Sequence, residues 1–426
     1  MPGGGSVMQS RENRTLEYKE RFTSTFLKTV SAFANYGGGT VIFGVADDGR
    51  PVGLDDPEQT CLDIENSVND NLSPVPPCSF ELDSSRKLVT LKVDEGPDKP
   101  YLYKGKAWRR IDTATVEVSR LELNRLILEG SNRNYEDLPA LSADLTFRVL
   151  EDKLRQALGI SALSRDVMKT LGLYTDAGGS NRAAELLADS NEFPGVDLVR
   201  FGASIDELRD REVHEHESVL LQYDHALALF RKYYQYEKIE GSERTLAELI
   251  PEKAFREALA NALVHRAWDV PAAVRVAMYD DRVEITSPGG LPPGLSEDEY
   301  LHSQISVLRN PRLANVLFRL GLVEKFGTGI RRIQSAYAGL LVSPVFSAYA
   351  ESVAVSLPVV NALPELDGDE RHVYGALFRG RIFTRGEIER ASGFGKAKLL
   401  RVLTRLEEKK VVERLGRGRG TRYRLR

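Results

Sequence analysis

The chain contains few cysteines and no long hydrophobic run. Its 426 residues include 2 cysteines, Cys61 and Cys78, and neither has motif spacing around it. This usage excludes a disulfide framework and is typical of free thiols in a reducing cytoplasm. The 6 histidines are scattered, so we expect no metal cluster built on them. Apolar runs fall short of the ~18–20 residues that cross a bilayer, which excludes a membrane-spanning segment.

Charge is unevenly distributed along the chain. The formal net charge is −4, but residues 369–426 carry 17 Lys and Arg against 7 Asp and Glu, a net charge of +10 that leaves −14 for the rest. A compact basic module on an acidic body predicts a polyanionic partner, most simply nucleic acid. The alternative is a solvated basic surface that has no partner.

Hydrophobic periodicity divides the chain into patterned modules. Helical and strand patterns alternate, which predicts an α/β (α+β) multidomain protein. A helix is expected over Thr25–Asn35, and strands over Thr40–Val45, Leu88–Val93 and Lys106–Asp112. The expected divisions are a flexible arm (1–14), a first α/β domain (15–130), a mostly helical connecting region (131–240), a second α/β domain (241–358), a linker (359–368) and the basic module (369–426).

The basic module has the pattern of three helices followed by two short strands around "GRGRG". Thr384 and Glu387 have capping-box spacing, and Leu399, Leu403 and Leu406 form one apolar stripe of the third helix. The whole segment resembles the winged helix-turn-helix family, whose third helix enters the major groove of double-stranded DNA. Contacts with protein alone are the alternative. The residues expected to bind DNA are Lys396, Lys398, Arg401, Arg405, Arg417, Arg419 and Arg422.

A helix in the second α/β domain places polar side chains on one face. In "PEKAFREALANALVHRAWD", Glu257, Asn261 and His265 follow one another at intervals of four residues, so they line up. A carboxylate and an amide one turn apart suit Mg²⁺ and an activated water molecule. The alternative is an ordinary amphipathic helix with solvated polar residues.

Two glycine-containing segments follow this helix, "SPGGLPPG" and "EKFGTGIRRI". In this order they resemble the nucleotide-binding fold of DNA gyrase, histidine kinases and mismatch-repair ATPases (GHKL-like), an α/β sandwich, and more closely its divergent branch in bacterial regulators. The resemblance covers about Pro251–Tyr337 and implies ATP with Mg²⁺ as ligand. It implies Glu257 as ATPase base, Asn261 as magnesium ligand, and His265, Gly289, Gly290, Gly327, Thr328 and Gly329 as further nucleotide-binding residues.

One residue departs from that fold. The superfamily has an aspartate before the first glycine segment that binds the adenine amino group, whereas this chain has Ser287 and Pro288 there. A different nucleotide, another small ligand or a vacant pocket are therefore the alternatives to ATP.

The glycine triplet Gly37–Gly39 lies between a helical pattern and a strand pattern. A phosphate loop has the opposite order, so we expect a chain reversal with Gly37 at the helix C′ position. With "LEYKERF" before it, this stretch resembles the Schlafen Alba-like domain over about Glu12–Leu128. That resemblance implies nucleic-acid binding, for which Lys19, Arg109 and Arg110 are the candidates, and in animal relatives an RNA-cleaving nuclease site, which Glu12, Glu17 and Asp47 match loosely.

Glu17 also has a simpler interpretation, because it can pair with Lys19 on the sheet surface. We expect a cytoplasmic, homodimeric regulator of transcription that binds double-stranded DNA and responds to a nucleotide or another small ligand, and that is not primarily an enzyme. The alternatives are a metal-dependent nuclease acting on RNA or DNA, used in defence, and an ATPase coupled to nucleic-acid remodelling.

Overall fold

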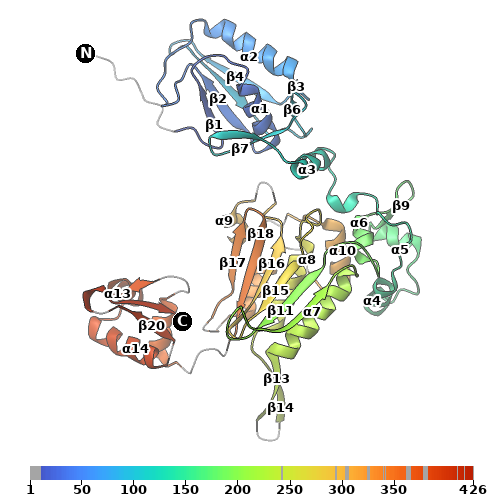
Figure 1. The fold of residues 1–426 in the computed structure, drawn as a ribbon, viewed down its shortest axis with the longest axis vertical. Coiled ribbons are helices and arrows are strands. Elements are labelled where there is room, and N and C mark those ends of the chain that lie inside the picture. Colours follow the sequence, from blue (N-terminus) through green and yellow to red (C-terminus); the bar gives the residue numbers. More distant parts are fainter. Residues whose placement is uncertain are drawn as a thin grey trace. The chain divides into compact units, whose positions relative to one another are not determined.

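The structure is a computed structural model that divides into two compact units, one mainly of residues 1–138 and the other mainly of residues 139–426 (Figure 1). Helices and mixed sheets alternate, which confirms the multidomain α+β class. No helix within the described part of the chain is long and apolar enough to cross a membrane. The described residues are 11–240, 243–292, 295–302, 307–323, 327–338, 340, 342–360, 366–377, 382–409, 411–416 and 418–425.

The N-terminal unit is a sheet packed against helices. Its elements are β1 (Leu16–Lys19), α1 (Phe26–Asn35), β2 (Gly39–Phe43), α2 (Pro57–Asn71), β3 (Leu72–Ser73), β4 (Cys78–Asp83), β5 (Leu88–Val93), β6 (Leu102–Tyr103), β7 (Trp108–Ile111), β8 (Ala114–Glu117), α3 (Arg120–Gly130) and a 3₁₀ turn (Tyr135–Asp137). The sheet order is β1-β2-β5-β4, with β1 parallel to β2 and the other pairs antiparallel. Phe26, Val30, Val41, Phe43 and Leu91 are buried between α1 and this sheet.

The glycine triplet reverses the chain between α1 and β2. Gly37 and Gly38 have φ of +70° and +73°, which glycine adopts without the steric cost of a Cβ. The Gly38 amide donates to the Phe33 carbonyl and closes the end of the helix. The predicted reversal is confirmed.

The second unit contains a six-stranded sheet in the order β12-β11-β15-β16-β18-β17. Helices α7 and α8 pack on this sheet, and the stacked rings of Phe230 and Phe255, 4.0 Å apart, join the two helices (Figure 1). The elements are α4 (Arg148–Leu158), α5 (Arg165–Thr170), β9 (Tyr174–Thr175), β10 (Gly179–Ser180), α6 (Arg182–Leu187), β11 (Val196–Phe201), β12 (Leu208–His214), α7 (Val219–Tyr234), β13 (Gln235–Glu240), β14 (Glu243–Glu248), α8 (Glu252–Val264), β15 (Val274–Met278), β16 (Arg282–Pro288), α9 (Glu297–His302), α10 (Pro311–Arg319), α11 (Gly329–Ala336), β17 (Val345–Tyr349) and β18 (Ser352–Pro358).

The sheet extends further back in the sequence than expected. Strands β11 and β12 come from residues that we had placed in the mostly helical connecting region, and β11 pairs parallel with β15. Alternate residues of β11, such as Val196 and Leu198, are fully buried. The alternation of period two in "VDLVRF" was the local signal for this strand.

The C-terminal segment has its own hydrophobic core. Leu399, Leu403 and Leu406 are buried there, as their spacing predicted, and Thr384 and Glu387 form the expected capping box. The small sheet has the order β19-β21-β20. The elements are α12 (Gly368–Gly375), β19 (Phe383–Thr384), α13 (Arg385–Ser392), α14 (Lys396–Glu408), β20 (Val412–Leu415), a 3₁₀ turn (Gly418–Gly420) and β21 (Arg422–Leu425).

Candidate functional site

A basic groove lies in the C-terminal segment between the first turns of α13 and α14 and the β20–β21 hairpin. Its volume is about 600 Å³. The glycines of the hairpin turn, Gly418 and Gly420, form part of its wall. The lining residues are Thr384, Arg385, Gly386, Lys396, Leu400, Arg414, Gly418, Gly420, Thr421, Arg422 and Tyr423.

Four of the lining side chains are cationic, and no Asp or Glu is among them. Lys396, Arg414 and Arg422 are exposed, and no ion pair within the described residues involves any of the three. Arg385 reaches Glu389 at 3.6 Å. Helix α14 begins at the groove, and its N-cap Gly395 supplies no side-chain hydrogen bond. Its first amides are therefore available to an anion, and the groove suits a phosphate backbone.

The structure divides the predicted DNA-binding residues into two groups. Lys396 and Arg422 line the groove, and Arg401 is exposed on α14. Lys398 instead pairs with Asp369 at 2.7 Å, and Arg405 pairs with Asp367 at 2.9 Å, so these two hold α14 against α12. Arg417 and the side chain of Arg419 lie outside the described residues.

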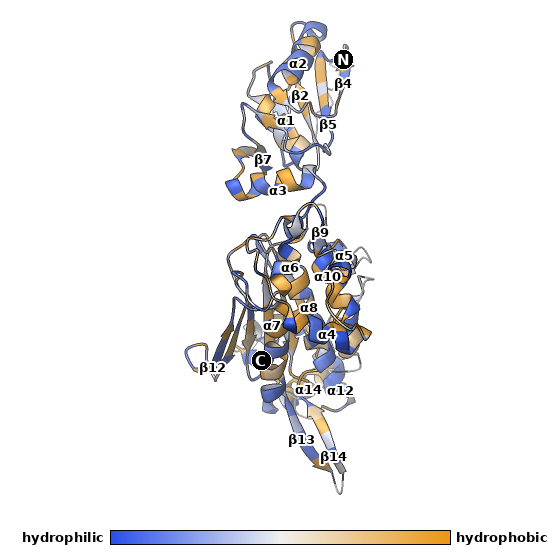
Figure 2. Cartoon of the chain, turned by 90° about the vertical axis from the view of Figure 1, so that its right-hand side faces the viewer, coloured by the Kyte–Doolittle hydropathy of each residue, from blue (hydrophilic) through white to orange (hydrophobic). Residues whose placement is uncertain are grey.

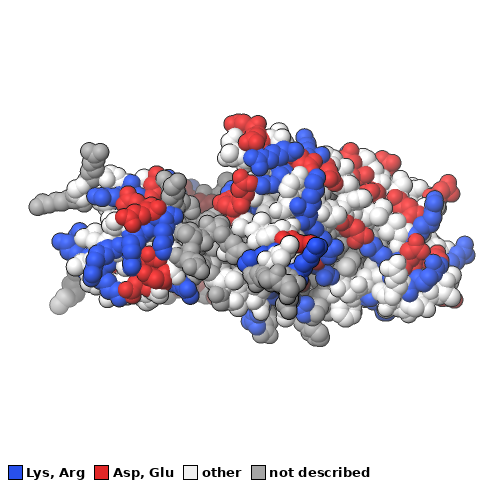
Figure 3. All heavy atoms as spheres, turned by 90° about the horizontal axis from the view of Figure 1, so that it is seen from below, with Lys and Arg blue, Asp and Glu red and all other residues white. Residues whose placement is uncertain are grey.

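Two cations of the groove, Arg385 and Arg414, were missing from the prediction. Arg385 follows the capping residue Thr384 directly, whereas Arg414 shares a face of β20 with the buried Val412, two residues earlier, yet is itself exposed. The cap was the available signal for Arg385, and the alternation along β20 gave none for Arg414. Lys and Arg gather on this segment beside a few acidic residues, at the left of Figure 3.

In the N-terminal unit, the predicted cations are already paired. Arg110, 7% exposed, donates to Glu17 and to the backbone carbonyl of Asn13. Lys19 also pairs with Glu17, at 2.5 Å, as the simpler interpretation predicts, but Glu17 is buried and does not lie on the sheet surface. Arg109 pairs with Glu122 at 2.7 Å. These side chains stabilise the unit itself and leave little charge for phosphates.

The three carboxylates of the nuclease alternative do not form a metal site. Glu17, 4% exposed, is occupied by Arg110 and Lys19. Glu12 accepts the Tyr18 amide at 2.7 Å, and Asp47 is exposed in a turn. Among the described residues they are not a group of ligands within 4.8 Å of one another. The geometry therefore gives no support to metal-dependent cleavage here.

The nucleotide-binding motif residues do come together in the second unit. Glu257 and Asn261 lie on α8, and the Asn261 amide donates to Glu257 at 3.4 Å. Gly329, the first residue of α11, packs directly on them, because a Cβ at this position would lie 2.4 Å from Asn261 Nδ2 and 2.9 Å from Glu257 Oε1. Thr328 is the N-cap of α11, and Gly327 before it has φ of +62°.

The first glycine segment and His265 are held by Arg309. Its guanidinium donates to the carbonyls of His265 and Gly290, at 3.0 and 2.7 Å. Gly289 has φ of +98°, and a Cβ there would overlap Arg309. Burial and the Arg309 charge lower the pKa of His265 to about 4, so the imidazole is neutral at neutral pH. His265 is a packed residue at the end of α8.

These residues do not fit ATP with Mg²⁺ in the manner of the superfamily. Ser287, at the adenine-aspartate position, is 6% exposed and donates its hydroxyl to the Ala262 carbonyl at 2.7 Å. Gly329, at the start of α11 where phosphates would bind, packs against the Glu257 carboxylate, and a negative charge is favourable at the positive end of a helix. A phosphate and a magnesium ion would require this contact to open.

At one place the histidines come closer together than the expectation of no metal cluster implies. His214, Glu217 and His225 bring potential ligand atoms within 4.8 Å of one another. The sequence analysis did not predict this group, because its members belong to three consecutive elements: the end of β12, the turn after it, and the second turn of α7.

Two segments of the chain match known families. Residues 12–119 match the family described as Schlafen, AlbA_2, and residues 272–357 match the family described as putative ATP-dependent DNA helicase recG C-terminal. The chain thus combines a Schlafen AlbA_2 domain with an ATPase-like domain of the RecG-related type, which indicates a function related to nucleic acids.

Two solved structures are similar to the chain. The crystal structure of the DIP2311 protein from Corynebacterium diphtheriae is 19% identical, with 97% of this chain and 92% of that chain covered and a TM-score of 0.48. The solution structure of the N-terminal domain of a putative ATP-dependent DNA helicase RecG-related protein from Nitrosomonas europaea is 27% identical, with 25% and 80% covered and a TM-score of 0.19. Neither likeness in shape is close enough to support a function. No curated protein matches the chain.

Proposed function

We propose that this protein is a regulator of transcription that binds double-stranded DNA through its C-terminal segment. The basic groove carries the proposal, since Lys396, Arg414 and Arg422 project into it without acidic partners among the described residues. The order of three helices and a three-stranded sheet is that of a winged helix, which supports a DNA-binding role. In this proposal α14 enters the major groove and the β20–β21 hairpin contacts the adjacent backbone.

Neutralising the groove should greatly weaken DNA binding. We expect Lys396→Gln, Arg414→Gln and Arg422→Gln together to lower the affinity for a duplex at ~0.1 M salt by about 100-fold or more. Each lost phosphate contact also removes about 0.9 from the slope of log K against log salt concentration, so the slope should fall by roughly 2–3. Fluorescence anisotropy of a labelled duplex at several salt concentrations measures both quantities.

The control removes charge from the same segment away from both the groove and the hairpin. Arg371 and Arg390 are exposed and do not line the groove, and their joint replacement by glutamine should change the affinity by no more than about threefold. A loss as large as that of the groove variant would contradict the groove and indicate diffuse attraction.

A homodimer is part of the proposal, because paired copies read two half-sites of a palindromic operator. A hairpin offers surface for such pairing: the register of β13 with β14 puts Ile239 and Leu246 on one face, and they are 67% and 63% exposed. Figure 1 shows this hairpin extending from the sheet, and Figure 2 shows apolar colour on β14. The anisotropy titration gives the stoichiometry, for which we expect two chains per palindromic duplex.

No nucleotide step belongs to the proposal. Since Gly329 at the start of α11 packs on Glu257 and Asn261, and Ser287 stands at the adenine-aspartate position, millimolar ATP or GTP with Mg²⁺ should leave the melting temperature unchanged. Differential scanning fluorimetry measures this shift, with ADP as a further ligand. If a nucleotide raised the melting temperature by several degrees, and Asn261→Ala removed that rise, nucleotide sensing would have to be part of the proposed function.

A further inference from the structure

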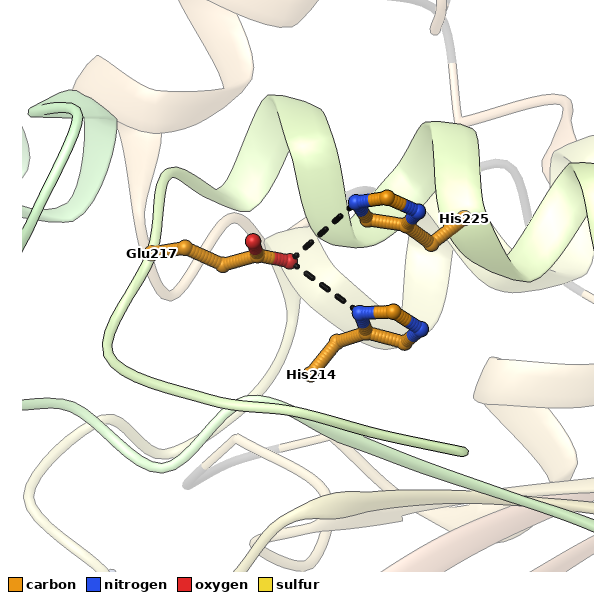
Figure 4. A group of neighbouring side chains, drawn as sticks. All are labelled: His214, Glu217 and His225. Carbon is orange, nitrogen blue, oxygen red and sulfur yellow. Dashed lines mark ion pairs between the residues drawn. The ribbon is translucent and has the colours of Figure 1, made fainter. Parts of the chain in front are cut away.

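A group of two histidines and a glutamate lies at one edge of the second unit. His214 ends strand β12, Glu217 lies in the following turn, and His225 is in the second turn of α7. Figure 4 shows both imidazoles turned toward the Glu217 carboxylate. Its Oε1 atom is 3.5 Å from His214 Nδ1 and 3.8 Å from His225 Nε2.

The Glu217 carboxylate has the properties of an unused ligand. Its Oε1 atom is buried and has no hydrogen-bond partner within the described part of the chain. A buried carboxylate oxygen without a donor is costly, so its position between two imidazole rings suits a bound cation. Imidazoles and one carboxylate are the donor set that Zn²⁺ and its neighbours in the transition series prefer, whereas Mg²⁺ and Ca²⁺ favour oxygen ligands.

A second layer of contacts holds this group in place. His214 Nε2 is 2.9 Å from Glu212 Oε2, so the ring nitrogen that faces away from Glu217 meets a carboxylate. Metal-binding histidines usually have such a partner, which fixes the tautomer and orients the ring. The Glu217 carbonyl accepts the side-chain amides of Asn191, at 2.9 Å, and Gln222, at 2.8 Å, and both of these side chains are buried.

We propose that His214, Glu217 and His225 bind one divalent transition-metal ion of the Zn²⁺ class, with His214 ligating through Nδ1. The rings are stacked 4.0 Å apart at 5°, and they must tilt toward each other to share an ion. This movement is inexpensive because the second side-chain torsion of histidine has a broad minimum. The side chains of His214, Glu217 and His225 are 17%, 24% and 42% exposed, so water can complete the coordination.

The ion would tie the edge strand of the six-stranded sheet to a helix that covers it. Strand β12 pairs only with β11 in this sheet, while α7 packs on β11 and α8. A metal between β12 and α7 therefore fixes a sheet edge that backbone hydrogen bonds hold on one side alone. The site does not depend on DNA binding, and its test is separate.

The experiment is a titration of the metal-stripped full-length chain with Zn²⁺ alone, measured by isothermal titration calorimetry. We expect one ion per chain and a rise in melting temperature of a few degrees at saturation. His214→Ala, His225→Ala and Glu217→Gln should each weaken binding by at least about 100-fold, and Glu212→Gln by about 10-fold. Circular dichroism without metal should be the same for all variants.

The matched control is His216→Asn. This histidine neighbours the group but is 52% exposed and has φ of +61°, which asparagine tolerates. Its replacement should leave Zn²⁺ affinity unchanged. Co²⁺ gives an independent readout, since a visible absorption band of low-symmetry Co²⁺ should appear in the native chain and in His216→Asn and disappear in His225→Ala. No Zn²⁺ binding, or binding that survives the three ligand variants, would overturn the proposal.

Discussion

Glu17→Gln is expected to lower the free energy of unfolding of the N-terminal unit by about 3–5 kcal/mol. The substitution leaves the Arg110 guanidinium buried without its carboxylate, and removing one partner of a buried pair costs far more than the pair contributes. Hydrogen–deuterium exchange of the full-length chain measures the loss, because amides of β1 and β2 should exchange at least about 100-fold faster.

Two controls separate this buried pair from ordinary surface charge. Lys19→Met removes the partly exposed partner of Glu17 and should cost less than about 1 kcal/mol. The double variant Glu17→Leu, Arg110→Met removes both buried charges and should recover most of the loss. If Glu17→Gln instead left exchange unchanged and abolished divalent-dependent cleavage of RNA, Glu17 would be a catalytic residue, and our interpretation of the pair would be wrong.

Arg266→Met should destabilise the second unit by roughly 3–5 kcal/mol. Arg266 is fully buried and donates to the carbonyls of Pro194 and Ala272, which precede β11 and β15. Its guanidinium also lies 4.1 Å from the Trp268 ring centroid. Burial lowers the pKa of Arg266 to about 10, so the group stays charged at neutral pH and its loss leaves buried carbonyls without donors.

Urea unfolding of the full-length chain, with exchange of the β11 and β15 peptides as the local readout, tests this expectation. Arg266→Lys keeps the charge, but a lysine lacks the planar fork that reaches both carbonyls. The free energy of unfolding should therefore fall by an intermediate amount. The matched control is Arg275→Met, on the exposed side of β15. It should change the free energy of unfolding by no more than about 0.5 kcal/mol. Equal stability of Arg266→Met and Arg275→Met would show that the buried hydrogen bonds contribute nothing.

The sequence by itself determined the features that depend on neighbouring residues. The capping box of Thr384 and Glu387, the reversal at Gly37 and the strand Leu88–Val93 all follow from local backbone and side-chain preferences. The resemblances read from the sequence, over about Glu12–Leu128 and Pro251–Tyr337, rest on short motifs in a fixed order and overlap the family matches at residues 12–119 and 272–357.

The tertiary structure alone decided which charged residues are available for a ligand. Glu17 pairs with Arg110, which is 93 positions away in the sequence, and Lys398 and Arg405 pair with acidic residues at the start of α12. Three candidates for catalysis or DNA binding therefore form ion pairs that stabilise the fold. His214 and His225 reach the Glu217 carboxylate through the turn between β12 and α7. A charge is neutralised by whichever opposite charge the fold places beside it, and the spacing of residues along one segment does not contain that information.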